Sequence, residues 1–178
     1  MVLIASALIQ ASQDPIMLKF SPARRPVLLT ILLLFPLQLA AQKPNWIPVA
    51  ELLLGSMGNA DPHKMSEVMN RCTALNMTLS ALTANESEEI SQGYENQALR
   101  LIQNGIMIEM NSEMERTGIE PDLESVSDQA VSHVKDMLGT YNTWMDENFA
   151  EAGSFFSNDL EIEMKSCELA TKIVMHRP

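Results

Sequence analysis

Residues 61–82, DPHKMSEVMNRCTALNMTLSAL, decide the expected fold. Asp61 suits the capping position of a helix, and Pro62 suits the first helical position because no N–H is needed there. Apolar side chains then recur at intervals of three and four residues, as on one face of a helix. They are Met65, Val68, Cys72, Leu75, Leu79 and Leu82. The stretch therefore predicts a long amphipathic helix whose buried face includes Cys72.

Three more long helices are expected downstream. The second covers residues 85–116, because Asn85 and Glu88 have the spacing of a capping box and Thr117-Gly118 is a stop signal. The third extends from 120 to about 153, and the last begins at Asn158. The last helix has an apolar stripe formed by Leu160, Met164, Cys167, Ala170 and Val174.

The composition supports an all-α protein. Only 5% of the residues are aromatic, while 46% are hydrophobic, and the aliphatic residues that dominate pack well between helices. We expect an antiparallel bundle of about four main helices over residues 61–178. Residues 42–60 form a lead-in, with a short helix from about 48 to 57.

The N-terminal part has the pattern of a secretory signal peptide. An uncharged, apolar run covers residues 27–41 and ends in small residues. It follows a basic segment that contains Lys19, Arg24 and Arg25. This order of charge, apolar run and small residues predicts a signal peptide over 1–41 and a secreted or periplasmic protein.

Two alternatives accompany the signal peptide. The apolar segment could remain uncleaved as a membrane anchor, although it is short for a membrane span and is interrupted by Pro36. With cleavage near Gln42, no stable membrane association is expected. A signal peptide that starts at Met17 would have an ordinary length, which suggests that residues 1–16 result from a mis-called start.

Two cysteines follow the signal segment, and both lie on apolar stripes. Cys72 is near the middle of the first main helix, and Cys167 is near the middle of the last. These two helices would be antiparallel neighbours in an up-down-up-down bundle, so their midpoints would lie level. We therefore expect a disulfide in an oxidising compartment. A redox-active pair is a less favoured interpretation, since the Cys-x-x-Cys spacing is missing. If the chain is not exported, two buried thiols that do not pair are the other alternative.

Charge and motifs narrow the classes of function. The net charge of −11 disfavours nucleic-acid partners, since phosphates would be repelled. The sequence has no His-Glu-x-x-His, Glu-x-x-His or Gly-x-Ser-x-Gly motif. The three histidines, His63, His133 and His176, lie in different segments, and His133 is interpreted as a half-buried residue at the core edge. No catalytic residue and no cofactor is therefore assigned.

Methionine is the unusual component, with 13 residues in the chain. Met107, Met110 and Met114 have helical spacing, and thioethers on one face could bind Cu(I). We favour the interpretation that they fill the core. The expected function is that of a non-enzymatic exported module that acts by binding an unknown protein partner or by structural support. The alternative is a carrier of a small ligand or Cu(I) in a methionine-rich interior.

Overall fold

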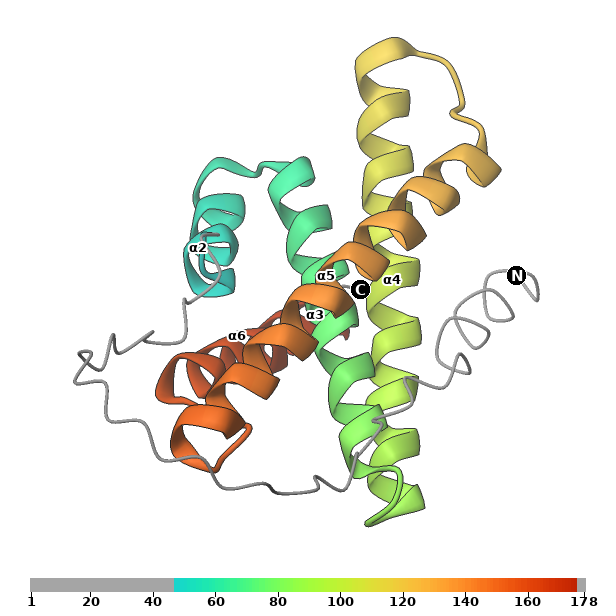
Figure 1. Cartoon of the computed structure of the whole chain (residues 1–178). Coiled ribbons are helices and arrows are strands. Elements are labelled where there is room, and N and C mark those ends of the chain that lie inside the picture. The colour runs from blue at the N-terminus through green and yellow to red at the C-terminus, as the bar shows by residue number, and fades with distance from the viewer. Residues whose placement is uncertain (1–46, 176–178) are drawn as a thin grey trace, which may run out of the picture.

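The computed structural model describes residues 47–175, and all regular structure in that part of the chain is helical (Figure 1). The signal peptide predicted at 1–41 lies outside the described residues. None of the helices within 47–175 is both long enough and apolar enough to cross a membrane. The helices are α2 (Val49–Asn59), α3 (Pro62–Thr83), α4 (Glu88–Thr117), α5 (Leu123–Ala152) and α6 (Asn158–Met175).

Helix α3 begins as the sequence predicts. The Asp61 carboxylate accepts hydrogen bonds from the backbone N–H groups of His63 at 3.1 Å and Lys64 at 3.2 Å. Pro62 is the first helical residue. The cap thus satisfies two of the N–H groups that a helix leaves unpaired at its start. The short helix expected at about 48–57 is also present, as α2.

The start of α4 differs from the capping box predicted at Asn85. The N–H groups of Glu86 and Ser87 both bond to the carbonyl of Thr83, so Asn85 lies inside a turn that continues from α3. Ser87 is the actual cap, and its hydroxyl accepts from a backbone N–H of the first turn at 3.4 Å. The end is as predicted: Gly118 closes α4 with a φ of 71°, which glycine adopts without strain.

The observed starts of α5 and α6 also differ from the predicted ones. The third helix, predicted from 120, begins at Leu123 with Asp122 as its cap, so Pro121 precedes the helix. At α6 the Ser157 hydroxyl accepts from a backbone N–H of the first turn, and Asn158 is the first helical residue. Between them, α5 ends at Gly153, as the sequence predicts.

Helices α3 and α4 form an antiparallel hairpin at the centre of the molecule (Figure 1). Gly105 of α4 permits their close approach. A Cβ atom added at Gly105 would lie 3.1 Å from the Cβ of Met69 and 3.3 Å from Oδ1 of Asn70. The hydroxyl of Ser66 also donates to the Gly105 carbonyl at 3.4 Å. A larger residue at this position would therefore push the two helices apart.

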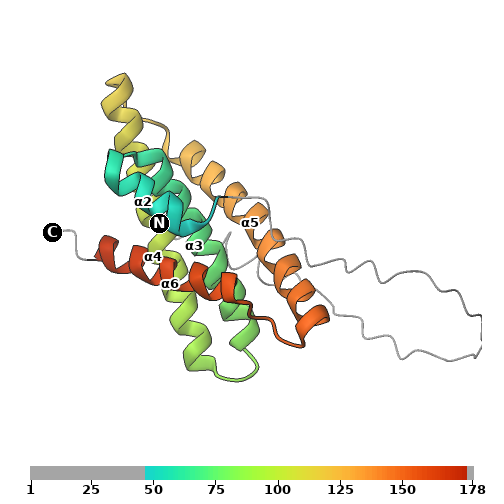
Figure 2. The ribbon, with the colours of Figure 1, turned by 90° about the vertical axis from the view of Figure 1, so that its left-hand side faces the viewer.

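The remaining helices lie obliquely on this hairpin, so a simple up-down-up-down bundle is not confirmed (Figures 1 and 2). Helix α5 packs on α3 and α4, while α2 packs on α3 and α6. Helix α6 crosses the hairpin steeply and contacts α2, α3 and α4. Helix α3 is therefore covered on several sides. Its buried surface is wider than the single apolar stripe that its sequence predicts. Its buried polar residues include Ser66, Asn70, Arg71, Thr73, Asn76 and Thr78.

The disulfide predicted between Cys72 and Cys167 is confirmed, with the two Cα atoms 5.2 Å apart. It joins the middle of α3 to the middle of α6, although the helices cross and do not run side by side. Both cysteines are buried. The bridge therefore ties the last helix to the central one.

Replacing both cysteines, as in Cys72→Ser with Cys167→Ser, is expected to lower stability markedly. The bridge spans 95 residues, and a loop of that size restricts the unfolded chain by about 4–5 kcal/mol in the chain-entropy description. Thermal unfolding followed by circular dichroism measures the loss, and mass spectrometry of non-reduced peptides tests the bridge itself. Two free thiols in the purified protein, or an unchanged melting temperature in the variant, would contradict this prediction.

Candidate functional site

A buried ion pair lies beside the disulfide. Arg71 of α3 and Glu163 of α6 form a salt bridge, and only 1% and 3% of their surfaces are exposed. Arg71 directly precedes Cys72, and Glu163 lies one helical turn before Cys167. Helices α3 and α6 are therefore joined by a covalent bond and by a charge pair at neighbouring positions.

The Glu163 carboxylate also reaches two other helices. Its Oε1 accepts a hydrogen bond from the Tyr141 hydroxyl of α5 at 3.0 Å, and its Oε2 accepts from the backbone N–H of Val49 at 3.0 Å. Val49 begins α2, which has no side-chain cap of its own, so Glu163 supplies that cap from a distant segment. Arg71 completes the network by donating to the carbonyl of Ile47. We call Arg71, Tyr141 and Glu163 the buried junction.

The electrostatics of the buried junction favour a neutral tyrosine. Burial raises the pKa of Tyr141 above its usual range, and the negative charge of Glu163 raises it further. The neutral hydroxyl is then held as a donor to the carboxylate. A buried charge is costly unless it is paired and hydrogen-bonded, and here each charge has a partner.

A groove lies between α3, α4 and α6 and has a volume of about 850 Å³. Apolar side chains make up much of its lining, while its charged residues are Glu161, Lys165 and Glu168 of α6. Cys167 also lines it, so the disulfide forms part of one wall. The apolar lining consists of Leu75, Leu79, Tyr94, Phe156 and Met164. Its volume is in the range of pockets that bind small molecules or the anchoring side chains of another protein.

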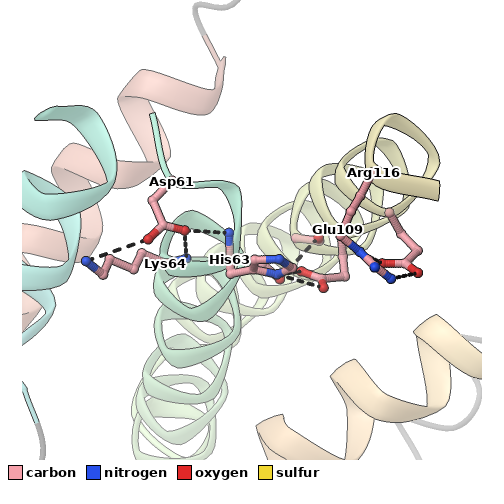
Figure 3. Close-up of polar contacts among 8 residues, drawn as sticks. Asp61, His63, Lys64, Glu109 and Arg116 are labelled. Atoms are coloured by element: carbon pink, nitrogen blue, oxygen red, sulfur yellow. Dashed lines mark hydrogen bonds and ion pairs between the residues drawn. The ribbon is translucent and has the colours of Figure 1, made fainter. Parts of the chain in front are cut away.

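A second, smaller cavity of about 250 Å³ lies among α3, α4 and α5, and we call it the polar cleft. At its mouth His63 of α3 reaches across to Glu109 of α4, with 3.0 Å between Nδ1 and Oε1 (Figure 3). His133 of α5 lines the same cleft. The structure thus brings together two histidines that the sequence places in separate segments, while His176 lies outside the described residues.

The methionines expected to fill the core divide into two groups. Met65 is buried, as its place on the apolar stripe of α3 predicts, and Met69 of the same helix is buried as well. Met107 and Met114 are 55% and 46% exposed, so the core interpretation is wrong for both, and Met110 is half-buried. Met107 and Met114 both lie in the C-terminal half of α4. Among residues 47–175, no group of three or more His, Cys, Asp or Glu side chains could hold a metal ion.

Comparison of the chain with family models, curated proteins and solved structures found no match. What the two cavities can do chemically follows from their linings. The groove offers apolar contact with a charged rim, which suits an apolar side chain flanked by polar groups. The polar cleft offers hydrogen-bond acceptors and carboxylates, which suit a small ligand with donors. The buried junction, in contrast, is closed to solvent, and it joins α3 to α6, two of the three helices that line the groove.

Proposed function

We propose that this protein is an exported, non-enzymatic helical module that binds a partner protein through the groove between α3, α4 and α6. The groove itself carries the proposal, because it is the larger of the two cavities described and combines an apolar lining with a charged rim. Phe156 at its edge is 43% exposed, so an apolar contact surface is already presented to solvent. Exposed apolar surface rimmed by polar groups is typical of interaction sites.

The buried junction and the disulfide support this function because they hold the groove walls in place. Helix α6 forms one wall, and it is joined to α3 through Cys167 and Glu163. A wall fixed before binding loses little conformational entropy when the partner arrives. The same contacts explain how a small helical protein keeps an open apolar groove without collapse.

The rim indicates the chemistry of the partner. Among the groove-lining residues of α6, Glu161 and Glu168 are acidic and Lys165 is basic, and Glu168 also pairs with Lys172, which is not in the lining. The chain as a whole carries a net charge of −11. A partner segment with one or two apolar anchors flanked by basic residues would match both features, since complementary charge speeds and orients association.

Photo-crosslinking from within the groove tests the proposal. Gln97 lines the groove on α4, whereas Gln103 of the same helix is also exposed but lines neither described cavity. With a photoreactive benzoylphenylalanine at each position in turn, we expect one predominant protein adduct from Gln97 in the producing cell and none from Gln103. The adduct should disappear in Phe156→Glu, because a buried charge would oppose apolar contact.

The matched control is Ile162→Glu, which places the same charge on an α6 residue that is 51% exposed and outside the groove. This variant should retain the Gln97 adduct. Adducts of equal yield from both glutamine positions, or an adduct that survives Phe156→Glu, would contradict binding through the groove. Circular dichroism of each variant establishes that the helices remain folded.

Export is the second part of the proposal. The disulfide is compatible with an oxidising, extracytoplasmic compartment, and the charged and apolar order of residues 19–41 supports a cleaved signal peptide. N-terminal sequencing of the protein recovered outside the cytoplasm is expected to begin near Gln42. Recovery of the chain with residues 19–41 intact in a membrane fraction would contradict cleavage and favour an anchor.

A further inference from the structure

The polar cleft has features that binding in the groove does not use. It is lined by residues of three helices, and its polar side chains come from all of them. Helix α3 contributes His63, Glu67 and Asn70, α4 contributes Glu109, and α5 contributes Gln129 and His133. Helix α5 forms a wall of the cleft, whereas α6 forms a wall of the groove, and both cavities share α3 and α4.

Two buried polar atoms of the cleft residues have no hydrogen-bond partner within the described chain. They are Oδ1 of Asn70, whose residue is 7% exposed, and Nε2 of His133. The Asn70 oxygen lies against Gly105, another cleft residue, where an added Cβ would be 3.3 Å away. A buried polar atom without a partner is unfavourable, so a ligand that donates a hydrogen bond to Asn70 would offset that cost.

The charged residues that line the cleft indicate which sign of charge such a ligand should carry. Glu67 and Glu109 line it, and no lysine or arginine is among its lining residues. Two basic residues in this region have carboxylate partners of their own: Lys64 pairs with Asp61, and Arg116 pairs with Glu113 (Figure 3). His63 bonds to Glu109 at the mouth. The cleft therefore favours a cation that carries N–H donors.

We propose that the polar cleft binds a small organic cation with a primary ammonium group, which donates to Asn70 and pairs with the carboxylates of Glu67 and Glu109. The volume of about 250 Å³ corresponds to roughly eight water volumes, which suits a ligand of about six to ten non-hydrogen atoms. A bare metal ion is a poorer match, since no group of three metal-ligating side chains is assembled within residues 47–175.

Isothermal titration calorimetry of the exported protein with 1,4-diaminobutane tests the proposal. We expect one saturable site, with binding weakened at least tenfold when the neutral analogue 1,4-butanediol replaces the diamine. In NMR spectra of nitrogen-labelled protein, addition of the diamine should change the chemical shifts of the Gly105 amide and of the His133 ring. Equal binding of the diol, or shifts confined to the groove residues, would overturn the proposal.

Two variants with the same change in net charge separate the cleft from the acidic surface as a whole. Glu109→Gln removes a cleft carboxylate, and Glu115→Gln removes an exposed carboxylate of α4 outside the cleft. Glu109→Gln should weaken diamine binding about tenfold or more, while Glu115→Gln should leave it within about twofold. Equal weakening in both variants would show non-specific attraction to the acidic surface and would contradict a site. Neither variant touches the groove, so this result is independent of partner binding there.

Discussion

The salt bridge between Arg71 and Glu163 is the contact on which the arrangement of the helices depends. Both groups are almost fully buried, so each charge would be strongly unfavourable without the other. The same carboxylate accepts hydrogen bonds from Tyr141 and from the first N–H of α2. One buried carboxylate thus fixes where four helices meet, and the adjacent disulfide joins two of them covalently.

Helix α3 relates this junction to both cavities. One part of its circumference contributes Leu75 and Leu79 to the groove, and another contributes Glu67 and Asn70 to the polar cleft. The helix can serve both because its neighbours enclose it on several sides. A wholly apolar α3 would remove Glu67 and Asn70 from the cleft and would leave the buried carboxylate of Glu163 without its charged partner.

The helical class, the approximate helix boundaries and the disulfide were predictable because each rests on local spacing: apolar periodicity, Asp61-Pro62, Gly118, and two cysteines on apolar stripes. The oblique packing of the helices could not be predicted, because crossing angles depend on contacts between distant segments. The buried junction had a detectable signal, since Arg71 adjoins Cys72 and Glu163 precedes Cys167 by one turn. The polar cleft had none, because His63 and His133 are brought together only by tertiary packing.

A double-mutant cycle across the buried pair tests this account most directly. Denaturant unfolding would be measured for the parent chain, Arg71→Met, Glu163→Gln and the double variant. Each single change should cost about 3–5 kcal/mol because it leaves one buried charge unpaired. The double variant should lose much less than the sum of the two, by more than about 1 kcal/mol. Small, additive losses in all three variants would contradict the claim that this pair determines how the helices are held together.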